Sequence, residues 1–217
     1  MLQNMGMESM PLIFLFTVIL LHLHSLQMHS LPIAPALYVF GDSLFDGGNN
    51  NFLPTICKAD YLPYGVNLSR EPLEYLPMFL SLPLSLSLLF LAEFLGLPYP
   101  PPYMSIRGLA TALKGLNYAS GSCGILPETG SQCGKCLNLK DQIDLFQRTV
   151  KSDLPGQIKN NTDLLQHLSK SIFLFSVGSN DFIDNYLEPA VFDTSKRYPP
   201  QQFVQVLMDA IAHHMEG

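Results

Sequence analysis

Ser43 stands in a turn that has the residue types a nucleophilic serine needs. The turn follows the apolar residues 36–40 and reads Gly-Asp-Ser-Leu-Phe-Asp-Gly-Gly over residues 41–48. A glycine-flanked turn after a strand exposes the serine hydroxyl and frees backbone N–H groups. The hydroxyl becomes a nucleophile when a base takes its proton. Ser43 is therefore a candidate nucleophile, with an ordinary turn as the alternative.

Two later turns carry groups that can stabilise negative charge on a reacting oxygen. Residues 178–181 read Gly-Ser-Asn-Asp, and the side-chain amide of Asn180 can donate to an oxyanion. Gly121 lies in another glycine turn and offers a backbone N–H. The alternative for Asn180 is an Asx turn that caps the following segment.

Three apolar runs lead into these turns and predict buried strands. They cover residues 36–40, 116–120 and 171–177, and each is followed by a glycine. Continuous rather than alternating apolarity is typical of parallel strands that are covered on both faces. Because the carboxyl ends of parallel strands meet at one edge of a sheet, we expect the three turns to lie together there.

Helical periodicity fills the intervals between the predicted strands. The first helix has apolar residues on one side and polar residues on the other, Leu139, Ile143, Phe146 and Val150 against Asp141, Gln142, Gln147 and Lys151. A shorter helix over residues 164–168 follows Thr162 and Asp163, which can cap it. A third helix, over residues 203–211, follows two prolines. This alternation predicts an α/β fold with a mostly parallel sheet.

The composition excludes one class of partner. The net charge is -6, and the 12 Lys and Arg residues form no basic run, which argues against nucleic acid as a partner. We expect no cofactor. Residues 75–92 form an uncharged Leu/Ser/Pro run that is long enough to span a membrane. Because the run contains prolines and serines and is followed by Glu93, we expect no stable membrane span.

Residues 1–30 predict a signal peptide. Residues 11–21 are an apolar core of signal-peptide length, although no Lys or Arg precedes them. An N-terminal anchor helix is the alternative. Asn67 and Asn160 begin glycosylation sequons, which are informative only in the secretory pathway. We therefore expect a secreted glycoprotein whose domain begins at residue 31.

The four cysteines are disulfide candidates, with three pairings open, and they are Cys57, Cys123, Cys133 and Cys136. Cys133 and Cys136 also suit half a zinc site or a redox pair. Zinc would need a second pair of ligands, and no histidine lies near Cys57 or Cys123 in the sequence. We therefore predict structural disulfides and no metal site.

Three ordered blocks of this sequence resemble the first three signature blocks of the plant GDSL esterase/lipase family, within the SGNH hydrolase superfamily. They are GDSLFDGGNNN at 41–51, GLNYASGSCGILPETG at 115–130 and LFSVGSNDFIDNYL at 174–187. The resemblance implies a flavodoxin-like three-layer α/β/α domain that hydrolyses carboxylic esters or acyl lipids. It also implies that Ser43 is the nucleophile and that Gly121 and Asn180 form the oxyanion hole with the Ser43 N–H.

The sequence departs from the family pattern at the catalytic base. The family carries Asp-x-x-His near the end of a longer chain, and this sequence contains no such spacing. The nearest arrangement is Asp209 and His213, four residues apart on one helix face, a weaker candidate for a substitute dyad. The other histidines lie in the leader (His22, His24, His29), in a predicted helix (His167) and next to His213 (His214). We expect a C-terminally truncated, incomplete domain, with a catalytically inactive secreted homologue as the alternative.

The second departure is an atypical insert at residues 75–90. The family has a polar, glycine-rich stretch there, whereas this chain has the Leu/Ser/Pro run. Non-coding or out-of-frame sequence explains such a replacement better than a new function does. We expect the insert to pack poorly and to expose apolar side chains. A membrane-anchored protein, held by the leader or by this run, is the third functional alternative.

Overall fold

The computed structural model describes residues 32–58, 82–105 and 109–216, without the side chains of residues 82–87 and 109–111. The predicted signal peptide, Asn67 and residues 75–81 of the insert lie outside the described residues. The strands are β1 (Leu37–Gly41) and β2 (Ile172–Ser176), and the α-helices are α2 (Leu82–Phe94), α3 (Leu139–Arg148), α4 (Asn161–Lys170), α5 (Thr194–Arg197) and α6 (Pro200–Met215). Short 3-10 or π-helical segments are η1 (Asn49–Phe52), η2 (Tyr103–Ser105), η3 (Leu109–Lys114), η4 (Ser131–Cys133), η5 (Thr149–Asp153), η6 (Leu154–Gly156) and η7 (Asp181–Tyr186).

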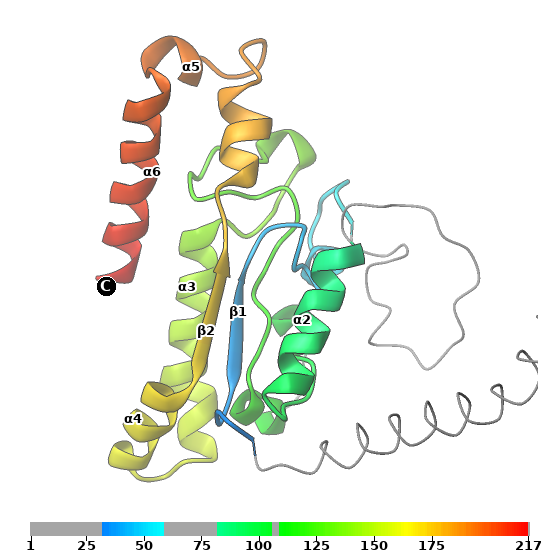
Figure 1. Cartoon of the computed structure of the whole chain (residues 1–217), viewed down its shortest axis with the longest axis vertical. Coiled ribbons are helices and arrows are strands. Elements are labelled where there is room, and N and C mark those ends of the chain that lie inside the picture. The colour runs from blue at the N-terminus through cyan, green and yellow to red at the C-terminus, as the bar shows by residue number, and fades with distance from the viewer. Residues whose placement is uncertain (1–31, 59–81, 106–108, 217) are drawn as a thin grey trace, which may run out of the picture.

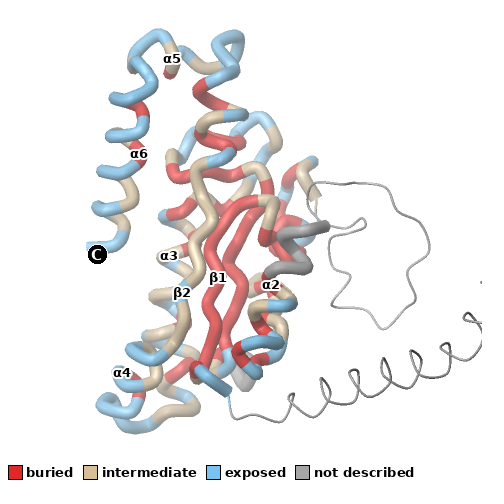
Figure 2. Tube along the Cα trace, viewed as in Figure 1, coloured by how far each residue is buried: buried red, intermediate tan, exposed pale blue. Residues whose placement is uncertain are grey.

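The described sheet consists of two parallel strands. β1 pairs with β2 in a register that runs from Leu37 opposite Ile172 to Gly41 opposite Ser176. All five residues of β1 are buried, as the red trace in Figure 2 shows. Gly41 permits this close pairing, because a Cβ atom at residue 41 would lie 2.8 Å from the Ser176 carbonyl oxygen. The predicted mixed α/β class with parallel strands is confirmed.

Helices cover both faces of this sheet (Figure 1). Leu37 and Val39 belong to a core cluster that includes Leu88 and Ala92 of α2. Their neighbours in the strand point the other way, so that Tyr38 and Phe40 lie in a second cluster with residues of α3 and α4. Successive side chains of a strand point to opposite faces. Burial on both faces therefore accounts for the continuous apolarity of β1.

The segment at residues 116–120 differs from its prediction as a strand. It runs beside β1, and Val39 N–H donates to the Leu116 carbonyl at 2.9 Å while Tyr118 N–H donates to the Val39 carbonyl at 2.8 Å. The structure assigns only isolated bridges there. One reason is that the next N–H of β1 on that side, from Gly41, donates to the Gln142 side chain instead of to this segment.

The three predicted helices are present as α3, α4 and α6, with two corrections. Gln142, predicted on the polar side of α3, is 1% exposed, because its amide bonds the backbone of β1. The cap of α4 is Asn160 rather than Thr162 or Asp163, since the Asn160 side chain accepts a hydrogen bond from Thr162 N–H. The contact of Gln142 joins residues 101 positions apart, so helical periodicity does not reveal it, whereas the cap of α4 is a local contact.

The described end of the atypical insert is helical. Residues 82–90 belong to α2, where Leu88 is 1% exposed and Phe90 is 62% exposed. The prediction of poor packing is therefore wrong at Leu88, which contacts the sheet cluster, and holds at Phe90. None of the helices in the described part of the chain is long and apolar enough to cross a membrane.

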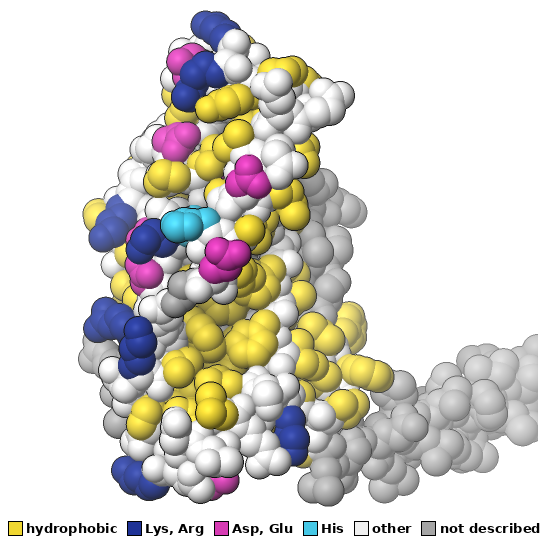
Figure 3. Space-filling model, turned by 90° about the vertical axis from the view of Figure 1, so that its left-hand side faces the viewer, with side chains coloured by type: hydrophobic (Ala, Val, Ile, Leu, Met, Phe, Trp, Pro, Cys, Tyr) yellow, Lys and Arg dark blue, Asp and Glu magenta, His cyan; other side chains and the backbone are white. Residues whose placement is uncertain are grey.

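One face of the described molecule remains apolar. Figure 3 shows hydrophobic side chains gathered between charged margins on the side of the molecule that carries α4 and α6. The exposed apolar residues of the elements on this side are Leu165, Phe173, Val204, Met208 and Met215. Phe173 lies in β2, the outer strand of the described sheet, and is 39% exposed. An open strand edge with apolar side chains favours pairing with another strand.

Candidate active site

Ser43, Gly121 and Asn180 line one pocket with a volume of about 450 Å³. They come from three segments of the chain. Ser43 follows β1, Gly121 follows the segment beside it, and Asn180 lies after β2 at the start of η7. The turns therefore lie together, as the parallel arrangement predicts. Further lining residues are Asp46, Ile56, Cys57, Lys58, Ser122, Gln132, Cys133 and Asp184.

The turn that carries Ser43 is held by its own backbone. Phe45 N–H and Asp46 N–H both donate to the Asp42 carbonyl, at 3.2 and 3.0 Å. The Asp42 side chain accepts from Leu44 N–H at 3.0 Å. Within the described residues, no protein hydrogen bond involves the Ser43 N–H, and Ser43 is only half-buried. Ser43 thus lines the pocket with its N–H free of hydrogen bonds to the described residues.

Asp46 joins this turn to the Gly121 turn. Its Oδ1 accepts from Gly48 N–H at 2.8 Å and from Asn49 N–H at 2.7 Å. Its Oδ2 accepts from Gly121 N–H at 3.0 Å. A carboxylate has enough acceptor positions for several donors. Asp46 therefore fixes Gly121 next to Ser43, and it also occupies the N–H that the resemblance assigns to the oxyanion hole.

Two buried asparagines complete the connection between the two turns. Asn49 Nδ2 donates to the carbonyls of Asn117 and Ala119, at 2.9 and 2.7 Å. Asn50 Nδ2 donates to the Gly121 carbonyl at 2.9 Å. Both backbone groups of Gly121 are therefore engaged. Such fully paired amides make a rigid junction, because any displacement leaves a buried polar group without a partner.

Asn180 is fixed by a second polar junction. Its Nδ2 donates to the Cys123 carbonyl at 2.9 Å. The neighbouring Asp181 is fully buried and accepts from Ile125 N–H at 2.8 Å and Leu126 N–H at 3.0 Å. An amide has two N–H groups, and one hydrogen bond is found for Asn180 in the described part of the chain. One donor therefore remains for a ligand.

Burial shapes the acidity of the pocket. It raises the pKa of Asp46 above its usual value, and the N–H groups of Gly48 and Gly121 partly offset this effect. Burial also raises the pKa of Asp42 and, together with the charge of Glu188, that of Asp184. Carboxylates whose pKa is raised in a cleft are frequent at functional sites. Asp46 and Asp184 line the pocket, and the negative charge of a carboxylate there disfavours an anionic substrate.

The ammonium group of Lys58 is not free to pair with the pocket carboxylates, because it donates hydrogen bonds to backbone carbonyls. Nζ donates to the carbonyls of Asn50, Asn51 and Leu53, at 3.2, 3.3 and 2.6 Å. These carbonyls lie within and just beyond η1, and the Asn50 carbonyl also accepts a hydrogen bond from Leu53 N–H. Lys58 is therefore engaged in fixing the wall of the pocket.

The cysteines form two disulfides, Cys57–Cys133 and Cys123–Cys136. The first joins two segments of the pocket wall, since both of its cysteines line the pocket. Three pairings were open from the sequence, and the structure selects one. No group of three or more His, Cys, Asp or Glu residues that could hold a metal ion occurs among the described residues.

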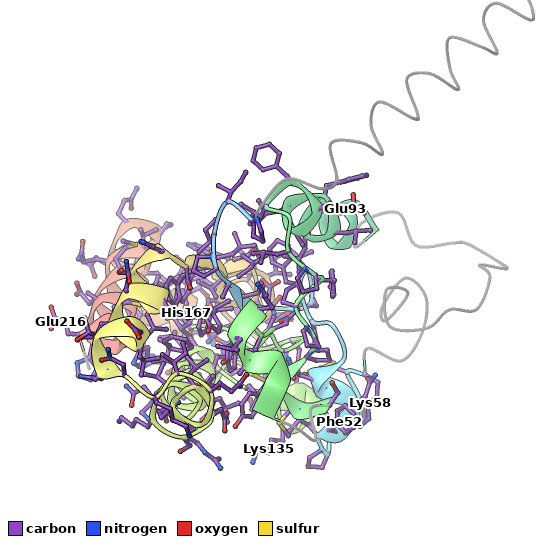
Figure 4. All side chains as sticks on the ribbon, turned by 90° about the horizontal axis from the view of Figure 1, so that it is seen from below. Phe52, Lys58, Glu93, Lys135, His167 and Glu216 are labelled. Carbon is purple, nitrogen blue, oxygen red and sulfur yellow. A yellow bond between two sulfur atoms is a disulfide. The ribbon has the colours of Figure 1, made fainter. Side chains whose placement is uncertain are left out.

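The described histidines lie away from Ser43. None of them lines the pocket. His213 and His214 lie in the last turn of α6, and His167 lies in α4. Figure 4 labels His167 and Lys58, a residue of the pocket wall, and they lie well apart. Asp209 accepts a hydrogen bond from Gln205 rather than from His213. No described histidine is therefore placed to act as the base of Ser43.

His167 gives the fold a pH dependence of known sign. Burial lowers its pKa, and the charge of Lys114 lowers it further. Its Nε2 is buried without a partner among the described residues. The folded state binds the His167 proton less readily than the unfolded state. We therefore expect His167 to cost no free energy of unfolding above about pH 6.5, where it is neutral in both states. We expect the free energy of unfolding to fall as the pH decreases through the lowered folded pKa.

Urea unfolding at pH 7.5 and pH 5 measures this effect. The loss on acidification should be smaller in His167→Gln than in the native chain. His214, whose pKa is also lowered, is present in both proteins and so does not enter the difference. An equal loss in both proteins would contradict the assignment.

Comparison with known proteins identifies the family. The model of the GDSL-like Lipase/Acylhydrolase family matches residues 37–216, which include all three turns of the pocket. The chain therefore belongs to the GDSL-like lipase/acylhydrolase family. A search of the solved structures found no significant match.

Two curated relatives from Arabidopsis thaliana match most of this chain. GDSL esterase/lipase 7 is 39% identical over 191 residues, which cover 83% of this chain and 48% of that protein. GDSL esterase/lipase At5g08460 is 35% identical over 183 residues, which cover 83% of this chain and 46% of that protein. The chain thus spans about half the length of the curated relatives that it matches.

Sequence reasoning found the three turns but missed the residues that hold them. Asp46, Asn49, Asn50 and Gln142 received no role in the site, although each bonds the backbone of another segment or turn. One signal was present for Asp46. An aspartate followed by a glycine pair is typical of a side chain that bonds the backbone two residues on. No comparable local signal marks Gln142.

Proposed function

We propose that this chain carries the nucleophile and oxyanion elements of a serine hydrolase that acts on carboxylic esters, as a GDSL esterase/lipase. One observation carries the proposal, namely that Ser43, Gly121 and Asn180 line the same pocket. Membership of the family supports it. The corresponding fold is a flavodoxin-like three-layer α/β/α domain, supported by helices on both faces of a parallel sheet.

In the proposed reaction, a base that the described residues do not supply takes the proton of the Ser43 hydroxyl, the Ser43 oxygen attacks the acyl carbon, and the carbonyl oxygen becomes an oxyanion. Collapse of this intermediate expels the alcohol, which takes the proton, and water then releases the acid from Ser43. The Ser43 N–H and the second N–H of Asn180 stabilise the charge of the oxyanion. Gly121 contributes only if its N–H leaves Asp46 when substrate binds, because the two are hydrogen-bonded here. Ser122 offers a nearby alternative, since its buried Oγ has no partner among the described residues.

The proposed substrate is a neutral acyl ester or lipid ester. The volume of about 450 Å³ lies in the range of small-molecule pockets. Asp46 and Asp184 line the pocket and disfavour an anionic group on the substrate, and the ammonium group of Lys58 is already engaged. An uncharged ester avoids this repulsion.

We further propose that the protein is secreted. Two disulfides support this, because disulfides persist in oxidising compartments. The apolar leader and the two sequons also support it. Asn160 is exposed, and its cap of α4 uses Oδ1, so that Nδ2 remains available for a glycan.

The alternative function is a catalytically inactive homologue that retains the ester pocket. It is favoured by one observation, the absence of a histidine from the described residues that line the pocket. A nucleophilic serine requires a base that takes its proton. Ester hydrolysis by the protein cloned from the full transcript distinguishes the two functions. The proposed enzyme hydrolyses esters, and the inactive homologue does not.

Hydrolysis of a p-nitrophenyl ester by the protein from the full transcript tests the proposal. Ser43→Ala should lower kcat by roughly a million-fold, and Asn180→Ala by roughly a hundred- to a thousand-fold. Ser179→Ala is the matched control, because Ser179 is exposed beside Asn180 and should retain full activity. Activity that survives Ser43→Ala would refute the role of Ser43, and no activity in the folded native protein would favour the inactive homologue.

A further inference from the structure

Gln142 binds both backbone groups of Gly41. Its Oε1 accepts from Gly41 N–H at 2.9 Å, and its Nε2 donates to the Gly41 carbonyl at 2.9 Å. The same Nε2 donates to the Leu137 carbonyl at 2.8 Å. The side chain is 1% exposed and does not line the pocket. Gln142 is thus an internal connection between the end of β1 and the start of α3.

The Gln142 amide takes the place of a backbone hydrogen-bond partner between β1 and residues 116–120. Val39 exchanges hydrogen bonds with Leu116 and Tyr118, on the side of β1 opposite β2. Because N–H groups two residues apart in a strand point the same way, Gly41 N–H faces that side too. It meets Gln142 instead of a carbonyl of residues 116–120. A side chain therefore replaces the backbone partner at the last residue of β1.

The position of Gly41 determines the position of Ser43. The turn after Gly41 is closed on itself by the hydrogen bonds of Leu44, Phe45 and Asp46 to Asp42. A unit closed in this way moves as a whole when the residue before it moves. The Ser120 N–H also donates to the Gly41 carbonyl, at 3.0 Å, so that this residue is held from two directions.

We propose that Gln142 is a positioning residue for Ser43, which it holds through Gly41. The inference rests on the proposed function of Ser43 as a nucleophile, because displacement of that hydroxyl from the oxyanion donors is what would lower the reaction rate. Gln fits the position because it supplies both a donor and an acceptor. Glu at neutral pH supplies acceptors only, and Met supplies neither a donor nor a strong acceptor.

A thiol at residue 43 reports on this positioning without any ester chemistry. All four native cysteines are in disulfides, so Ser43→Cys introduces a single free thiol. Its reaction with 5,5′-dithiobis(2-nitrobenzoate) follows the thiolate, whose pH profile depends on neighbouring carboxylates and N–H donors. We expect Gln142→Met, added to Ser43→Cys, to change the reaction rate at least about fivefold and to shift the pH profile.

Thr149→Val, also added to Ser43→Cys, is the matched control. Thr149 is fully buried and follows α3, but its hydroxyl bonds Tyr118 and Leu145 rather than β1. The substitution removes both hydrogen bonds of the Thr149 hydroxyl without touching Gly41, so the reaction rate of the introduced thiol should stay within about twofold. Equal rates in the Gln142→Met and Thr149→Val proteins would overturn the proposal, since a general loss of stability would then account for both.

Hydrogen exchange of the Gln142 side-chain amide tests the proposal in the native chain. It is therefore informative even if the Gln142→Met protein does not fold. Both Nε2 hydrogens of Gln142 should exchange slowly in NMR spectra, because each is donated to a buried carbonyl. Rapid exchange of both would overturn the proposal. The thiol and exchange measurements do not depend on catalysis. If the protein from the full transcript has no esterase activity, the proposed function is refuted. The thiol reaction and the amide exchange still test the position of Gln142 in that case.

Discussion

The 217-residue polypeptide should hydrolyse a p-nitrophenyl acyl ester at least about ten-thousand-fold more slowly than the protein from the full transcript, if that protein is the proposed enzyme. The reason is the environment of Ser43. No described histidine lines its pocket, and the Asp46 carboxylate there already accepts hydrogen bonds from backbone N–H groups of Gly48 and Gly121. A serine hydroxyl without a base remains protonated at neutral pH. Oxyanion donors alone leave roughly a thousand-fold acceleration over water.

Circular dichroism and two variants make this measurement decisive. A native spectrum shows that low turnover reflects missing chemistry rather than unfolding. Ser43→Ala should leave the residual rate within a few-fold of its starting value. Turnover equal to that of the longer protein, abolished by Ser43→Ala and by His213→Ala, would show instead that Asp209 and His213 act as a dyad. That outcome would contradict the placement of His213 at the end of α6.

The second large effect concerns the disulfides. Replacement of both Cys57 and Cys133 by Ser should lower the free energy of unfolding by about 4 kcal/mol, and replacement of Cys123 and Cys136 by about 3 kcal/mol. The first pair is separated by 76 residues and the second by 13. A longer closed loop restricts the unfolded chain more, and this difference sets the order of the two effects.

Urea titration of the native chain and the two double variants checks this order. Without the Cys57–Cys133 disulfide, the two segments that it joins keep their backbone hydrogen bonds. Ile56 N–H donates to the Cys133 carbonyl, and Lys135 N–H donates to the Pro54 carbonyl. The pocket wall should therefore persist locally while global stability falls. A larger loss from the variant that lacks Cys123 and Cys136 would contradict the loop argument. Peptide mapping without reduction that found another pairing would contradict the structure itself.

Much of the fold could be predicted because the evidence for it is local. β1, β2, α3, α4 and α6 each lie in a run whose apolarity or periodicity spans only a few neighbouring residues. The three glycine turns also stand out in the sequence, and parallel strands bring such turns to one edge. The coarse geometry of the candidate site follows from these two facts together.

The errors at residues 116–120 and at Gln142 arise where a side chain bonds a distant backbone group. Residues 116–120 have strand composition, yet Gln142 takes the Gly41 N–H that would continue the ladder. Gln142 itself was assigned to the polar side of α3, because hydrophobic periodicity treats an amide as a surface residue. In the interior an amide is stable when all of its hydrogen bonds are made, and those of Gln142 are made.

The chemistry-bearing residue types, the segments that form β1, β2, α3, α4 and α6, and the family of the three blocks could all be read from the sequence. Which cysteines pair, that Asp46 holds the Gly121 N–H, and that Gln142 faces β1 became clear only from the folded structure. These contacts join residues separated by 76, 75 and 101 positions. Composition and periodicity act over a turn or a strand, whereas contacts at such separations exist only once the chain has folded and excluded water from the groups that form them.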